Sequence, residues 1–140
     1  MSEIITDKLT GKTSAGDVDV TSEGGAVTMQ LQQGLAKAWA KFDASSGTPT
    51  ANDSFNLGSF TDTATGRHTF NFTNDMGSAG NYVMYGSSSG GEADGSVKVI
   101  MYDETAAVKT ASGMSFMVKG SASPEYDETD SSIAFLGDLA

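Results

Sequence analysis

Apolar and polar residues alternate along much of this chain with the period of two that is typical of β-strands. The clearest example is Arg67–Thr73, in which His68, Phe70 and Phe72 share one face and polar side chains form the other. Turn-forming residues interrupt the alternation every ~8–12 residues, a spacing typical of a β-sandwich or barrel. Gln30–Lys41 is rich in good helix formers, but Gly34 interrupts a helix there and the alternation after it favours a strand at Ala36–Asp43. No segment has a convincing amphipathic helical pattern.

The pattern predicts about six or seven strands after residue 35. The segments expected to form them are Ala36–Asp43, Ser54–Asp62, Arg67–Thr73, Asn81–Gly86, Ser96–Asp103, Gly113–Gly120 and Ile133–Leu136. Gly58 shifts the alternation within the second segment and predicts a β-bulge there. Thr63–Gly66 predicts a tight hairpin turn, and the polar residues 44–53, 87–95 and 121–132 are interpreted as loops.

We therefore expect an all-β fold, an antiparallel, jelly-roll-like β-sandwich with an extended N-terminal arm. Large aromatic side chains are expected to form its core, namely Trp39, Phe42, Phe55, Phe70, Phe72 and Tyr82. Trp39 and Phe42 fall on opposite faces of their strand unless a bulge intervenes. His68 is expected to pack beside the phenylalanines of its own strand or to lie at an edge.

Residues 1–35 differ from the rest because their β-type runs are short and separated by glycine-containing breaks. The runs are Glu3–Thr6, Asp17–Thr21 and Ala26–Leu31, and so narrow an apolar face cannot bury itself. We expect its apolar residues to pack on a neighbouring subunit, a larger partner or the following domain; they are Ile4, Val18, Val20, Val27, Met29 and Leu31. The predicted division is an attachment and oligomerisation arm at 1–35 and a β-sandwich domain at 36–140.

Composition restricts the partners and the chemistry. The chain has a formal net charge of −10, so nucleic acid and anionic membranes would repel it. No run approaches the ~20 apolar residues of a membrane helix, and we expect no membrane insertion. The absence of cysteine excludes disulfides, thiolate metal sites and cysteine nucleophiles.

Few residues suggest a catalytic or cofactor site. His68 is the only histidine, and one histidine without cysteine cannot fill a zinc site. Gly11-Lys12-Thr13 resembles the end of a phosphate-binding loop, but Thr6 stands where that motif needs its first glycine. We therefore expect no catalytic residue and no cofactor.

The acidic segment from Glu125 to Asp130 is the one weak candidate for a metal site. Asp127, Glu128 and Asp130 are close enough in sequence to share a hard cation such as calcium, although they do not match the twelve-residue calcium loop. A solvated loop is the favoured interpretation. Tyr126 is expected to be exposed, and the same loop is an alternative site for a glycan.

A series of short motifs runs in order through residues 36–86. They are Lys37-Ala38-Trp39, Phe42, Ser54-Phe55-Asn56, Thr61-Asp62, Thr65-Gly66, Asn71-Phe72-Thr73 and Asn81-Tyr82. This series resembles a domain widespread in tailed bacteriophages, where it occurs in tail fibres and other appendages as a structural and adhesive module.

The resemblance implies a non-enzymatic virion protein, homotrimeric by analogy with phage fibres. It would be attached to other virion proteins through its N-terminal arm, with a host surface glycan as a further partner. Two alternatives stay open: a capsid decoration, cement or head-fibre protein, and a carbohydrate-binding receptor module.

Overall fold

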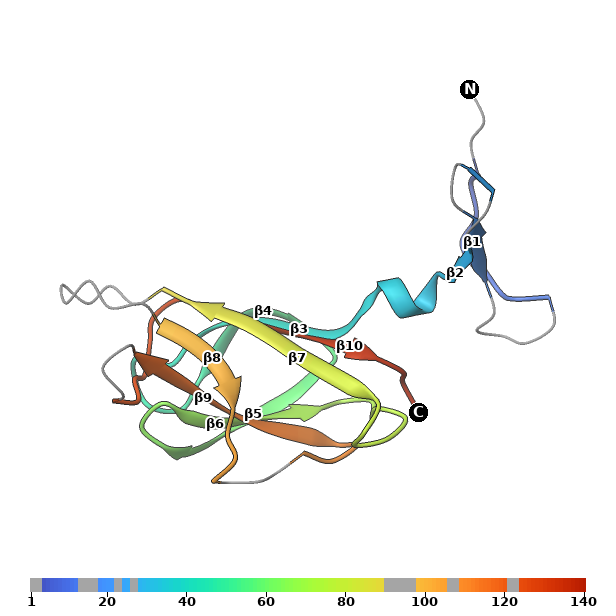
Figure 1. Ribbon diagram of the computed structural model, residues 1–140. Coiled ribbons are helices and arrows are strands. Elements are labelled where there is room, and N and C mark those ends of the chain that lie inside the picture. Colours follow the sequence, from blue (N-terminus) through green and yellow to red (C-terminus); the bar gives the residue numbers. More distant parts are fainter. Residues whose placement is uncertain are drawn as a thin grey trace. The chain divides into compact units, whose positions relative to one another are not determined.

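The chain forms two compact units, residues 1–35 and residues 36–140. The computed structural model (Figure 1) describes residues 4–12, 18–21, 24–25, 28–89, 98–105, 109–120 and 124–140. Its described strands all pair in antiparallel fashion. The all-β class and the antiparallel, sandwich-like arrangement expected from the sequence are confirmed.

The smaller unit contains one short hairpin. Strand β1 (Asp19–Thr21) pairs with β2 (Thr28–Gln30), and the 3-10 helix η1 (Gln32–Gly34) follows. The described part of the first expected β-type run, residues 4–6, forms no strand. A period-two pattern over so few residues does not specify a partner strand. The pattern alone therefore could not predict whether this run pairs.

The apolar residues of the smaller unit differ in exposure. Val20 and Met29 face each other across the hairpin and are 45% and 58% exposed. Val18 and Leu31 are partly buried, and the Leu31 amide donates to the Val18 carbonyl at 2.7 Å. Val27 lies outside the described residues.

The larger unit is one eight-stranded sheet in the order β4-β3-β10-β7-β8-β9-β6-β5. Its strands are β3 (Ala36–Asp43), β4 (Thr50–Phe55), β5 (Leu57–Ala64), β6 (Arg67–Phe72), β7 (Tyr82–Ser88), β8 (Lys98–Tyr102), β9 (Gly113–Gly120) and β10 (Ser131–Gly137). The strand that the sequence missed is β4, because most of its residues are polar and exposed. It is an edge strand, and one-sided backbone pairing needs no hydrophobic alternation.

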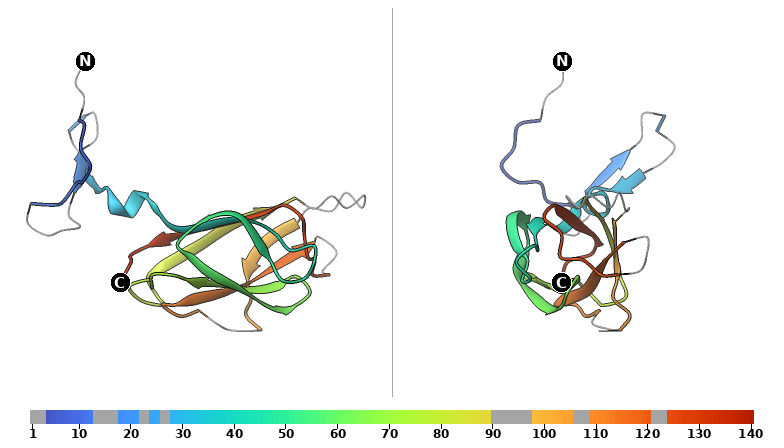
Figure 2. Two further views of the ribbon diagram at one scale, coloured as in Figure 1. Left: turned by 180° about the vertical axis from the view of Figure 1, so that it is seen from behind. Right: turned by 90° about the vertical axis from the view of Figure 1, so that its left-hand side faces the viewer.

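The two edge strands of this sheet, β4 and β5, are consecutive in the chain and only Asn56 separates them. The segment Ser54–Asp62, expected to be one strand, is therefore split at Asn56. Because both edges meet at one residue, the sheet must curl round until it nearly closes, as the end-on view in Figure 2 shows. The expected bulge is confirmed: the β5–β6 register shifts between Leu57 and Ser59.

Asn56 has the left-handed backbone conformation (φ 56°) that allows the chain to turn between the two edges. Its side-chain amide donates to the Lys37 carbonyl at 3.1 Å and to the Asn74 carbonyl at 3.0 Å. Its side-chain oxygen accepts from the Asn74 amide at 2.7 Å, and its own carbonyl accepts from Thr73. The residue thus joins the start of β3 to the segment that follows β6.

Aromatic side chains fill the space that the curled sheet encloses. Of the residues expected in the core, Phe42, Phe70, Phe72 and Tyr82 are buried there. They pack with residues that include Phe116 and Phe135, which are fully buried. Phe135 lies 4.9 Å from Phe70 and 5.0 Å from Phe72 between ring centroids, in edge-on geometry.

Two residues expected in the core, Trp39 and Phe55, lie outside it. They are paired across β3 and β4 on the outer face, where Phe55 is 52% exposed and Trp39 is partly exposed. The inner face of β3 carries Ala38 and Phe42 instead, together with Ala40. Aromatic size alone predicted the wrong face; strand alternation, which places Trp39 with the exposed Lys41, would have predicted the right one.

Among the residues that the structure describes, no helix has the length and apolar character needed to cross a bilayer.

We predict that replacing Asn56 destabilises the larger unit. Asn56→Gly keeps the turn but removes the side-chain hydrogen bonds, and should cost about 2–3 kcal/mol in the free energy of unfolding. Asn56→Ala should cost about 1 kcal/mol more, because alanine disfavours a positive φ. Chemical denaturation measures both, and Phe55→Ala, one residue away and half exposed, is the control expected to change little. Equal stability of all three variants would contradict the assigned role.

Candidate functional site

The acidic segment Glu125–Asp130 does not form a free loop, because its carboxylates bind the sheet at separate points. The Asp127 carboxylate accepts a hydrogen bond from the Gly66 amide at 2.6 Å. Glu128 lies 3.6 Å from the Lys98 ammonium, and Asp130 lies 3.5 Å from the Lys41 ammonium. The three carboxylates considered for calcium thus face three different partners rather than one common point.

Within the described residues, no group of three or more acidic or histidine side chains is arranged to hold a metal ion. This agrees with the pairing above, since a hard cation needs several oxygen ligands directed at one centre.

Lys98 of β8 and Glu128 of the acidic segment form a buried ion pair. Both side chains are almost completely buried, and the Lys98 ammonium also lies 3.3 Å from the centre of the Tyr126 ring. Tyr126, expected to be exposed, is only partly so because this cation–π contact draws it against the sheet. Lys98 and Ile100 alternate with exposed residues along β8 and lie on its buried face.

Arg67 precedes His68 on β6, so its side chain lies on the opposite face of that strand. There it connects two acidic segments. Its guanidinium donates to the buried Asp103 carboxylate at 2.8 Å and to Glu125 at 2.7 Å. The hydrogen bond from Arg67 lowers the pKa of Glu125 below its ordinary value. These contacts hold the start of the acidic segment in place.

His68 is fully buried between two carboxylates. Its Nδ1 lies 3.4 Å from Asp62 and its Nε2 lies 3.4 Å from Asp127, while its ring packs 5.6 Å from Phe116. Burial lowers the pKa of His68, and the carboxylates of Asp127 and Asp62 act in the opposite direction. The expected packed position is confirmed, and a side chain without exposed surface offers a substrate no access.

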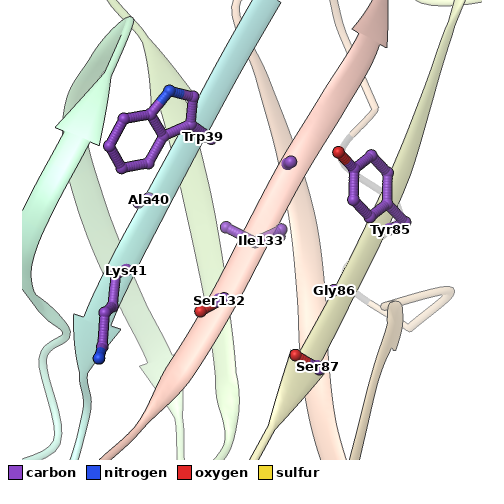
Figure 3. A pocket seen from close by; sticks show the side chains of 9 residues that line it. Trp39, Ala40, Lys41, Tyr85, Gly86, Ser87, Ser132 and Ile133 are labelled. Carbon is purple, nitrogen blue, oxygen red and sulfur yellow. The ribbon is translucent and has the colours of Figure 1, made fainter. Parts of the chain in front are cut away.

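A groove opens on the outer face of the sheet, along β10 and between β3 and β7. It has a volume of about 430 Å³, and Figure 3 shows its lining side chains. Trp39 stands on one side and Tyr85, 55% exposed, on the other, with Ala134 between them on the central strand. This concave surface with two aromatic walls is the candidate functional site.

The strand register arranges the groove in two rows. Ala134 pairs with both Trp39 and Tyr85, which makes an apolar row across three strands. Two residues along β10, Ser132 pairs with both Lys41 and Ser87, which makes a polar row. Sequence reasoning missed this site because it assigned Trp39 to the core and the three strands are far apart in the chain.

Comparison with known proteins gave no match: no protein-family model, no curated protein and no solved structure matches this chain. The likeness to phage-appendage domains therefore stays a prediction from the motifs.

We predict that the acidic segment stabilises the fold through Asp127 and not through Asp130. Asp127→Ala removes the acceptor of the partly buried Gly66 amide and should cost about 1–3 kcal/mol in the free energy of unfolding. Asp130→Ala, the matched control, removes an exposed ion pair and should change it by less than about 0.5 kcal/mol. Denaturant titrations measure the free energy of unfolding of both variants. Equal losses in the two variants would contradict the prediction.

We predict that His68 makes stability depend on pH. Its folded-state pKa is lowered, so the unfolded chain binds the proton more tightly, and stability is present above the unfolded value and lost as the pH falls towards the folded value. Unfolding free energies measured from about pH 7.5 down to pH 5 should fall for the natural chain and stay flatter for His68→Gln. This range lies above the titration of Glu125, whose pKa is also lowered. Parallel pH profiles would contradict the prediction.

Proposed function

We propose that this chain is a non-enzymatic structural protein of a bacteriophage virion, an oligomeric tail fibre or tail appendage anchored by residues 1–35. The observation that carries this proposal is the exposed apolar surface of the smaller unit. The motif series in residues 36–86, which resembles phage-appendage domains, also supports the proposal.

The smaller unit exposes large apolar side chains that a stable free hairpin would not. Ile4 and Ile5 are 85% and 86% exposed, Leu9 is 57% exposed, and Val20 and Met29 are also exposed. A two-stranded hairpin is at best marginally stable by itself in water. Exposed apolar residues gathered in such a segment are typical of a surface that another chain covers. We infer that residues 1–35 pack on other virion proteins or on copies of this chain.

Three features support our proposal that the larger unit is a displayed scaffold rather than an enzyme. Its only histidine is fully buried, and the acidic segment is engaged in ion pairs and hydrogen bonds with the sheet. The net charge of −10 favours solubility of many copies held close together. A homotrimer, as in phage fibres, is the assembly we propose.

We predict that deleting residues 1–30 abolishes attachment to the virion and leaves a folded β domain. The arm supplies the covered surface in this proposal, whereas the sheet closes on its own core. Particles assembled with the truncated chain should lack it by immunoblot, and circular dichroism of the purified truncated chain should show β structure with a cooperative thermal transition. A truncated chain that still joins particles would contradict the proposal.

Labelling of the intact chain on particles provides the matching control. Gold-labelled antibody seen by electron microscopy on the tail supports the tail appendage, and label on the head would replace it with capsid decoration. Particles without the chain would exclude a virion protein altogether. Solution mass measurement of the intact chain tests the trimer separately.

A further inference from the structure

The outer groove combines two surfaces that one small ring-shaped ligand could use together. Trp39 and Tyr85 are two strand spacings apart, about 10 Å, and β10 lies between them. In Figure 3 the Tyr85 ring lies on the side of β7 toward β10, whereas the Trp39 ring extends from β3 away from β10. Both side chains line the groove, so a ligand lying along β10 meets an aromatic side chain at each margin.

The floor of the groove is low because the central strand carries small side chains there. Ala134 and Ser132 occupy the outward positions of β10. Ala134 lies between two aromatic side chains, and Ser132 lies between Lys41 and Ser87. A large residue at either position would fill the space. The recess therefore depends on these two residues as much as on its aromatic walls.

The second row of the groove supplies hydrogen-bonding groups. Lys41, Ser132 and Ser87 are exposed and are paired across the same three strands. They lie two residues along from the aromatic row, about 7 Å away. The site thus changes from apolar to polar within the width of one sugar ring.

We propose that the Trp39–Tyr85 groove binds a pyranose ring of a surface polysaccharide. A pyranose has an apolar face of C–H groups, which suits the aromatic walls, and an edge of hydroxyl groups, which suits the ammonium and hydroxyls of the second row. The proposal rests on the proposed function, because an appendage displayed on a virion meets the polysaccharide of the host surface. It assigns that contact to the sheet face and not to the acidic segment, whose Tyr126 and carboxylates are held by the sheet.

A protein surface fits the groove less well. Covering Trp39 and Tyr85 with a flat apolar partner would also bury the ion pair of Lys41 with Asp130, and it would bury two serine hydroxyls without compensating hydrogen bonds, at a cost in free energy. The recess between the walls would stay empty. A second copy of the chain on this face is the competing outcome that the experiment must detect.

The single tryptophan of the chain makes the test direct, since Trp39 is itself a wall of the groove. The intact chain is titrated with dextran, a β-1,3-glucan, mannan and galactan while the tryptophan emission is recorded. At least one of these neutral polysaccharides should shift the emission in a saturable way at millimolar sugar concentration or below. Calorimetry with the same polysaccharides provides a second readout that also serves variants without tryptophan.

Four variants locate the binding. Tyr85→Ala and Trp39→Ala should each weaken it about tenfold, because each removes one stacking surface. Ala134→Phe should abolish it by filling the floor while both walls remain. Val83→Ala is the matched control, an apolar residue of β7 that is 60% exposed but does not line the groove, and it should bind like the natural chain. Thermal unfolding of each variant verifies that it is folded.

Three results would overturn the proposal: no response to any of the four polysaccharides, binding that survives Ala134→Phe, or a fall in the solution mass of Tyr85→Ala, which would identify the groove as a subunit interface. None of these measurements uses virions. Loss of sugar binding therefore leaves the virion location intact, and a chain absent from particles leaves a measured sugar affinity intact.

Discussion

The closure of the sheet at Asn56 is the constraint on which the larger unit depends. One residue separates the two edge strands, so the eight strands cannot lie flat and must wrap around a common interior. The side chain of Asn56 holds this corner by hydrogen bonds to backbone groups of Lys37 in β3 and of Asn74, which follows β6. The phenylalanines then have an enclosed space to fill, and both edges that could pair with other chains are drawn together.

The acidic segment Glu125–Asp130, near the C-terminal end of the sequence, also stabilises the larger unit. A charge buried in a protein interior is costly unless a partner is placed beside it. Here Lys98 meets Glu128, Arg67 meets Asp103 and Glu125, and His68 lies between two carboxylates. Composition predicted that this segment is a solvated loop. Instead, ion pairs and hydrogen bonds hold it against the sheet. Its charges are occupied by structure, which leaves the outer groove as the better surface for recognition.

The two faces of β3 separate core packing from the ligand contact that we propose. Ala38, Ala40 and Phe42 point into the core, while Trp39 and Lys41 point outward into the groove. The motif Lys37-Ala38-Trp39 is thus divided between the two roles. Residues 1–35, with exposed isoleucines and a minimal hairpin, add a third role that we assign to attachment. Anchoring, folding and ligand contact would then use separate residues of a short chain.

The sequence by itself determined the all-β class, most strands, the bulge at Gly58 and the turn before Arg67, because these follow from local alternation and glycine. It also placed His68 on one face with Phe70 and Phe72 and left a packed or an edge position open, and the structure shows the packed one. Only the tertiary structure decided which face of β8 points inward, since both faces of that strand carry apolar residues. It alone placed Phe55 outside, made an edge strand of the polar residues 50–55, and brought Trp39, Ser132 and Tyr85 together, because strand order is set by pairings between distant segments.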